Sequence, residues 1–152
     1  TLRALRRIEP SLRLGRSVPR ITRDWYSNRL TRPGLIATVL AARRVLPPLL
    51  IRELRTGRID AVMAHWGLLT PRFARQITAH GELYVWTVDD PAWMLAGMSR
   101  GVDGLITNKP DLAREVVARR AGMSDAQRLL VALLIRVGAR PETLEDENAL
   151  RP

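Results

Sequence analysis

The two histidines, His65 and His80, are the side chains of this sequence best suited to proton transfer, because imidazole titrates closest to neutral pH. His65 stands near the end of a strand-like run from Ile59 to Trp66. There it could contact a substrate, or it could be a buried or solvated histidine. His80 lies in the last turn of an expected helix, where the helix dipole favours a cationic ring. We therefore take His65, and not His80, as a candidate substrate-binding residue.

Two acidic clusters, Asp89-Asp90 and Glu145-Asp146-Glu147, could in principle hold a metal ion or act as a base. Asp90 precedes Pro91, and this pair is typical of a helix N-cap followed by the first helical position. The second cluster lies in a polar tail that begins near Arg140 and is expected to fray. The sequence has no cysteine, which excludes a disulfide framework and a thiolate metal site. We expect neither acidic cluster to do catalytic chemistry.

The stretch from Leu83 to Pro110 reads as a strand, a helix and a second strand. Residues 83–88 are rich in β-branched and aromatic side chains, as buried strands are. A helix from Pro91 is expected to end at Gly101, the residue type that most often follows a helix. Residues 104–107 make the next strand. Two strands joined by one crossover helix are parallel, so the sequence predicts a parallel sheet.

The same alternation extends over residues 12–121 and predicts an α/β fold. Further strands are expected at residues 12–18 and 59–66, and further helices at 2–10, 33–46, 49–55, 71–80 and from Pro110. Pro47-Pro48 should separate the helices at 33–46 and 49–55, because a proline inside a helix removes a hydrogen bond and clashes with the preceding turn.

Residues 84–91, Tyr-Val-Trp-Thr-Val-Asp-Asp-Pro, and 101–110, Gly-Val-Asp-Gly-Leu-Ile-Thr-Asn-Lys-Pro, resemble the last part of glycerophosphodiester phosphodiesterases. That family has a sequence close to V-W-T-V-N, a helix, and then G-V-D-G-I-I-T-D-x-P. Residues 2–10 also fit the family's L-x-x-L-R-x-x-x-P helix. The resemblance implies the C-terminal portion of a TIM (β/α)8 barrel, with parallel strands and outer helices, over residues 1–121. An extension helix and a polar tail are expected at 122–152.

The resemblance also implies metal-dependent hydrolysis of glycerophosphodiesters to glycerol 3-phosphate and an alcohol. The family uses two histidines for proton transfer and a divalent cation, Ca or Mg, held by carboxylates. Its catalytic motifs are His-Arg-Gly, Glu-x-Asp, His-Asp and Glu-x-Lys, and none of them occurs in residues 1–152. We therefore expect no catalytic or metal-binding residue in this chain and no activity of the chain alone. Since it begins at Thr1, we expect it to be a piece of a longer protein.

Trp86 is the one site position that the resemblance transfers, as a wall against the apolar side of the substrate. The alternative is that Trp86 belongs to the barrel core. Strand alternation places Tyr84, Trp86 and Val88 on one side and Val85 and Thr87 on the other. The family match favours the Trp86 side as the inner one.

Residues 19–58 form a connection that is longer than one crossover helix requires. Its first part contains basic and aromatic side chains, namely Arg20, Arg23, Trp25, Tyr26, Arg29 and Arg32. This part leaves the carboxyl end of a strand, where parallel barrels hold their active sites. It could form a basic and aromatic lip over an anionic substrate, with Arg20 as a candidate substrate-binding residue. The other interpretation is a solvated loop, since charged runs are usually exposed.

Residues 124–127, Ser-Asp-Ala-Gln, have the pattern of a capping box that opens a helix. The expected apolar face of this helix consists of Leu129, Leu130, Leu133, Leu134 and Val137. We expect this face to pack on the barrel exterior. A surface for a partner is the alternative interpretation.

The formal net charge is +10, and all basic residues except Lys109 are arginines. This charge permits a nucleic-acid or anionic-membrane binder as an alternative, as does a non-catalytic barrel-derived binding module. No nucleic-acid motif is visible, so we expect no nucleic-acid partner. The resemblance implies a small-molecule glycerophosphodiester substrate, and a peripheral membrane contact is left open. The longest apolar stretch, Leu35 to Ile51, is interrupted by Arg43-Arg44 and Pro47-Pro48 and cannot span a bilayer. A cytoplasmic location is favoured, and the oligomeric state is left open.

Overall fold

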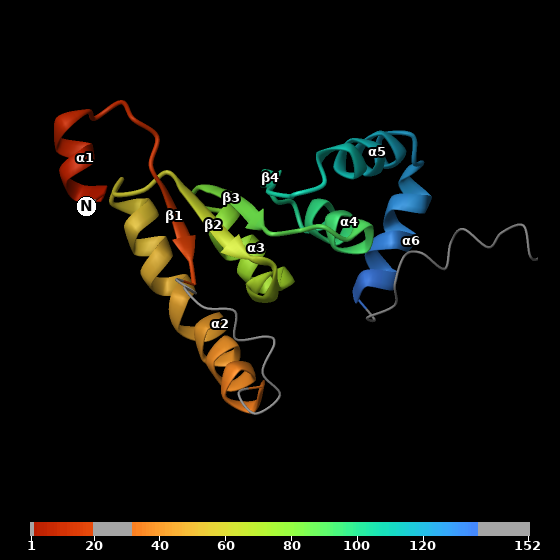
Figure 1. Ribbon diagram of the computed structural model, residues 1–152, viewed down its shortest axis with the longest axis horizontal. Helices are drawn as coiled ribbons and strands as arrows, with labels where there is room; N and C mark the ends of the chain where they lie inside the picture. Colours follow the sequence, from red (N-terminus) through yellow and green to blue (C-terminus); the bar gives the residue numbers. More distant parts are fainter. Residues whose placement is uncertain (1, 20–31, 137–152) are drawn as a thin grey trace, which may run out of the picture.

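The computed structural model describes residues 2–19 and 32–136 as an α/β fold (Figure 1). Its strands are β1 (Gly15–Val18), β2 (Ala61–His65), β3 (Glu82–Trp86) and β4 (Gly104–Leu105). Its helices are α1 (Leu2–Ile8), α2 (Arg32–Arg55), α3 (Pro71–Thr78), α4 (Pro91–Ser99), α5 (Pro110–Ala121) and α6 (Asp125–Arg136), and a 3-10 turn, η1 (Trp66–Leu68), follows β2. The expected lip from Arg20 to Arg29 and the polar tail lie outside the described residues.

All four strands lie in one parallel sheet in the order β1-β2-β3-β4. Residues 15–18 pair with 61–64, and residues 61–65 pair with 82–86. β4 adds a short edge, with Tyr84 opposite Gly104. Helices α2, α3 and α4 connect successive strands. The predicted α/β class, the strand order and the parallel β3–α4–β4 unit are therefore confirmed.

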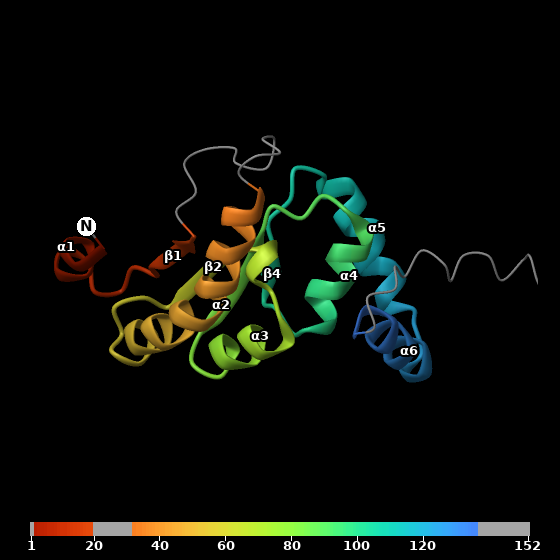
Figure 2. The same ribbon diagram turned by 90° about the horizontal axis from the view of Figure 1, so that it is seen from below.

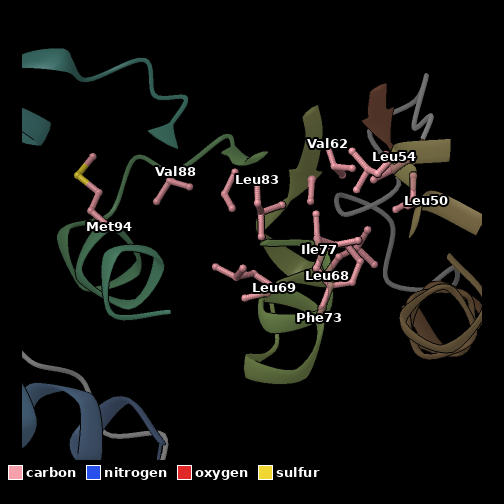
Figure 3. Packing of buried hydrophobic residues seen from close by; sticks show 14 of the residues in the cluster. Leu50, Leu54, Val62, Leu68, Leu69, Phe73, Ile77, Leu83, Val88 and Met94 are labelled. Atoms are coloured by element: carbon pink, nitrogen blue, oxygen red, sulfur yellow. The ribbon is translucent and has the colours of Figure 1, made fainter. Parts of the chain in front are cut away.

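The core lies between one face of the sheet and the helices α2 and α3, and it continues through Val88 to Met94 of α4 (Figure 3). Alternate strand residues point to this face and are fully buried, namely Val62, Ala64, Leu83 and Val85. The helices contribute Leu50, Leu54, Phe73, Ala74 and Ile77 to the same cluster. Burying each large apolar side chain of this kind stabilises the fold by about 1.5–3 kcal/mol. The buried face predicted for the helix at 71–80 is thereby confirmed.

The opposite face of the sheet is only half-buried. Met63, Tyr84 and Trp86 stand on this face by strand alternation, and each keeps an intermediate exposure. Since the core helices pack on the other face, this is the side that a closed barrel turns inward. The structure therefore places Trp86 on the side that the sequence favours as the inner one.

The two prolines in the middle of α2 do not end the helix, so the expected break at Pro47-Pro48 is wrong. α2 is continuous from Arg32 to Arg55. In Figure 2 its orange first part and its gold last part run in different directions. A proline in a helix removes a hydrogen bond and displaces the preceding turn, which kinks the helix. The turns beyond the prolines are kept by packing, because Leu50 and Leu54 are buried there.

The predicted helix starts are confirmed by their hydrogen bonds. Asp90 Oδ1 accepts from the backbone N–H of Ala92 at 2.8 Å and of Trp93 at 3.2 Å. Thr70 Oγ1 accepts from the Phe73 N–H at 3.0 Å. The capping box also forms: the N–H of Gln127 donates to Ser124 Oγ at 3.3 Å, and the N–H of Ser124 donates to Gln127 Oε1 at 2.9 Å. Each cap satisfies N–H groups that a helix leaves without an internal partner.

The observed strands are shorter than the predicted ones. The strand expected at 104–107 keeps only two residues, Gly104 and Leu105, although the backbone of Ile106 still bonds to Val85 and Val88. The strand expected at 59–66 ends at His65, whose ring accepts from the Gly67 N–H and caps η1. His80 lies two residues beyond the end of α3 at Thr78, so its expected place in the last turn is also wrong.

α6 forms as predicted, but it buries a different side from the expected one. Leu129, Leu130 and Leu133 are 62%, 45% and 49% exposed, whereas Val131 is buried and Ile135 packs against the core. Val137 lies outside the described residues. α6 packs against α4 (Figure 1). Because α6 is apolar around much of its circumference, this contact determines which of its apolar side chains are buried. The division of the chain at residues 121 and 122 stays a prediction.

No helix in residues 2–19 or 32–136 combines the length and apolar character needed to cross a membrane. This agrees with the arginines and prolines that interrupt the apolar stretch from Leu35 to Ile51.

Candidate functional site

His65 and Trp86 lie opposite each other at the carboxyl ends of β2 and β3. They are the last paired residues of these two parallel strands. Strand alternation puts both on the face away from the core. Their ring centroids are 5.1 Å apart and the ring planes meet at 78°, which is a favourable edge-to-face contact. The structure therefore brings together two of the three candidate residues; the third, Arg20, lies outside the described residues.

The environment of His65 favours a neutral ring. Its Nδ1 accepts a hydrogen bond from the Gly67 N–H at 3.1 Å, which assigns the proton of the neutral imidazole to Nε2. Burial lowers the pKa of His65, because a partly buried imidazolium loses hydration. At neutral pH the ring is therefore a hydrogen-bond donor through Nε2 and not a fixed positive charge.

Trp86 is held in place by the neighbouring strand. Its Nε1–H donates to the backbone carbonyl of Met63 at 3.0 Å, and the peptide bond after it is cis. The only polar atom of the indole is satisfied by this bond. What the side chain can offer to a ligand is accordingly its flat apolar ring.

Two further tryptophans extend this surface. Trp66 lies against His65, with centroids 5.3 Å apart, and against Trp93, with centroids 4.9 Å apart. Trp93 is 41% exposed. We call the four rings of His65, Trp66, Trp86 and Trp93 the aromatic wall. Sequence analysis missed Trp66 and Trp93 as site residues, although each follows the carboxyl end of β2 or β3 within a few positions.

A cation from α2 supports the turn behind the wall. Arg43 donates to the carbonyl of Gly67 through Nε at 3.1 Å and Nη2 at 2.7 Å. Gly67 is also the residue whose N–H donates to His65. Arg43 therefore fixes the position of the histidine indirectly, a role that no sequence pattern indicated.

Asp89 connects the two loops at this edge of the sheet. Its carboxylate accepts from the backbone N–H of Asn108 at 2.7 Å, from Asn108 Nδ2 at 3.0 Å and from Thr107 Oγ1 at 2.8 Å. The bonds from Asn108, followed by the one from Thr107, lower the pKa of Asp89. The charged carboxylate is thus stabilised as a structural link, and the absence of a catalytic role for Asp89-Asp90 stays a prediction.

The residues that the structure describes include no group of three or more His, Cys, Asp or Glu side chains that could hold a metal ion. The acidic groups near the wall already accept hydrogen bonds from the protein, since Asp89 accepts from the Asn108 N–H and Asp90 caps α4. The described part of the chain therefore does not fit the divalent cation that the resemblance implies. That its ligands lie outside this chain stays a prediction.

A protein described as probable glycerophosphodiester phosphodiesterase 2 of Mycobacterium tuberculosis is similar to this chain in sequence. The two are 31% identical over 72 residues, which make up 47% of this chain and 27% of the relative. The chain thus spans about a quarter of the length of the curated relative that it matches. No protein-family profile matches the chain.

Two solved structures share the fold. A protein of Silicibacter pomeroyi assigned as a glycerophosphoryl diester phosphodiesterase matches with a TM-score of 0.53 and 16% identity, over 78% of this chain and 35% of its own. An Oleispira antarctica phosphodiesterase, solved with the product sn-glycerol-3-phosphate, matches with a TM-score of 0.52 and 14% identity, over 77% of this chain and 38% of its own. At these identities the likeness shows the fold alone, a parallel α/β sheet that corresponds to part of a TIM barrel. In sequence over 72 residues and in fold over most of its length, the chain thus resembles glycerophosphodiester phosphodiesterases, as its own motifs predict.

Proposed function

We propose that this chain is the C-terminal part of a phosphodiesterase that hydrolyses glycerophosphodiesters to glycerol 3-phosphate and an alcohol. In that reaction water adds to phosphorus and the P–O bond to the alcohol breaks. The similarity to a relative of that description and the shared fold support the proposal. The observation that carries it is the aromatic wall, because parallel barrels bind their substrates at the carboxyl ends of the strands.

In this proposal the wall binds the non-reacting side of the substrate. The indole of Trp86 lies against the glycerol carbons and excludes water beside the phosphate. The neutral ring of His65, which lies edge-on against Trp86, contacts the substrate beside the indole. Arg20 adds positive charge from the lip. These residues bind and orient the substrate, and none of them transfers a proton to the leaving group.

The proton-transferring histidines and the carboxylates for calcium or magnesium belong, in the same proposal, to the part of the protein outside residues 1–152. Two observations support this division. The four catalytic motifs are absent from the sequence, and residues 2–19 and 32–136 gather no metal-binding group.

The test measures the release of glycerol 3-phosphate from glycerophosphocholine. The complete protein should release it, and a chelator should stop the reaction until calcium or magnesium is restored. The purified 152-residue chain should release none, because it lacks the catalytic motifs. Release by the 152-residue chain would contradict the division of roles, and an inactive complete protein would contradict the proposed hydrolysis.

A non-catalytic module that keeps the fold is the second candidate, and the missing motifs favour it. It predicts that the complete protein binds glycerophosphocholine without hydrolysing it. Calorimetric titration of the complete protein, followed by analysis of the recovered ligand, separates the two candidates.

A further inference from the structure

A second site of unusual composition lies away from the aromatic wall, between α3, α4 and α6. It is a cavity of about 560 Å³ whose polar lining includes Thr70, Arg72, Arg75, Ser99 and Arg100. The α6 side of the cavity is apolar, formed by Ala132 and Ile135. None of these residues belongs to the aromatic wall. We call this cavity the arginine cavity.

Its three arginines have no acidic partner within the described part of the chain. Arg72 and Arg75 are exposed on successive turns of α3 and form no ion pair with a described residue. Arg100 is only half-exposed, and its Nη1 donates to the carbonyl of Leu69 at 3.1 Å. Burial, followed by the nearby charge of Arg43, lowers the pKa of Arg100. A partly buried cation near a second cation, here Arg43, is unfavourable without a compensating anion.

A second cavity, of about 370 Å³, offers a contrast within the same molecule. It also contains arginines, but Glu53 lines it. Arg6 in its wall is bonded to Asp60. There the protein supplies its own negative charge, whereas in the arginine cavity the described residues supply none.

The hydroxyl of Ser99, on α4, completes the polar side of the arginine cavity. Ser99 Oγ accepts from Arg120 Nη1 at 3.1 Å, which leaves the serine hydroxyl hydrogen as a donor. Guanidinium groups bind phosphate oxygens through paired, charge-assisted hydrogen bonds. A phosphate is small enough to leave room for an attached organic group in a cavity of about 560 Å³.

We propose that the arginine cavity binds the phosphate group of an anionic ligand, separately from the substrate at the aromatic wall. Arg72 and Arg75 contact the phosphate oxygens from α3, and Arg100 approaches from the end of α4. The apolar side of α6 receives the organic part of the ligand. The phosphate comes from a soluble phosphate compound or from the headgroup of an anionic phospholipid.

The test uses the complete protein and the variant Arg72→Gln/Arg75→Gln. Both arginines are exposed, so the variant should fold, and its melting temperature without ligand checks this. The matched control is Arg52→Gln/Arg55→Gln, which removes two exposed arginines with the same spacing from α2. Binding of inorganic phosphate is measured by calorimetry at constant ionic strength, and cosedimentation is measured with phosphatidylcholine vesicles that contain or lack phosphatidylglycerol.

The dissociation constant for phosphate, or for the phosphatidylglycerol vesicles, should rise about tenfold or more in Arg72→Gln/Arg75→Gln, since hydrogen bonds to charged groups contribute roughly that much. The control should bind as the unmodified protein does. An effect in the phosphate arm identifies a soluble ligand, and an effect confined to vesicles identifies a headgroup; either supports the site. Equal losses in variant and control, or unchanged binding in both arms, overturn it.

Discussion

Trp86 offers the sharpest test of the aromatic wall, because two substitutions separate its contribution to folding from its contribution to binding. Trp86→Phe keeps a flat ring but loses the hydrogen bond to Met63, which should cost about 1 kcal/mol of stability. Trp86→Ala also removes the half-buried ring. An aromatic side chain buries 150–250 Å² when fully packed. Since Trp86 is of intermediate exposure, about two thirds or more of that area is buried, which at roughly 25 cal/mol per Å² gives a further loss of about 3–5 kcal/mol.

The two substitutions should affect catalysis differently from stability. If the indole is a wall for the glycerol carbons, Trp86→Ala should lower kcat/KM for glycerophosphocholine by about 1–3 kcal/mol, or roughly 5- to 150-fold. Trp86→Phe should retain most of the activity, since a ring remains. Urea unfolding and steady-state kinetics of the complete protein measure both quantities. A folded Trp86→Ala fraction with unchanged kcat/KM would refute a binding role and leave Trp86 as a residue of the core.

Three further predictions concern stability. Because burial lowers the pKa of His65, the unfolded chain binds more protons below pH of about 6.5; stability should fall as the pH drops through that region, and His65→Asn should flatten the decline in urea unfolding. Asp90→Ala should cost about 1 kcal/mol through loss of the α4 cap, whereas Asp90→Ser should unfold at nearly the original urea concentration; equal losses would argue against the cap. Gly81→Ala should cost about 1–3 kcal/mol, because its Cβ would lie 2.5 Å from Leu54 Cδ2 and 2.8 Å from the Asp60 carbonyl. Gly122→Ala, whose Cβ would lie 3.6 Å from the Arg119 carbonyl oxygen, serves as its control and should change stability little.

Structural features that depend on adjacent residues could be predicted from the sequence. The Asp90-Pro91 and Thr70-Pro71 starts need only a side-chain oxygen and a helix beside it. The order of the parallel strands follows from the alternation of strand and helix patterns along the chain. Neither requires knowledge of what packs where, so both could be predicted.

Features that depend on distant residues were not readable. Asp60 Oδ2 accepts from the Leu14 N–H at 2.7 Å, and Asp103 Oδ2 accepts from the Leu83 N–H at 2.8 Å. Each carboxylate precedes one strand and bonds to the start of the neighbouring strand. The two partners are 46 residues apart in the first pair and 20 in the second. The contact between Trp66 and Trp93 likewise appears only when two loops meet. The side of α6 that is buried depends on α4 in the same way.

The inner face of the sheet shows why the wall alone cannot enclose a substrate. A Cβ on Gly104 would lie 2.7 Å from Tyr84 Cδ1, and one on Gly15 would lie 3.0 Å from Met63 Cε. Large side chains of the central strands thus lie over glycines of the edge strands, an alternation of large and small residues that small barrels use to fill their interior. Yet Tyr84 and Met63 remain only half-buried, because the four strands cover them from one side. The aromatic wall continues this face at the carboxyl ends of β2 and β3, so it too is backed by the sheet and open in front. A ligand held against Trp86 needs a second wall to exclude water from its phosphate, and the proposed hydrolysis therefore requires strands beyond these four.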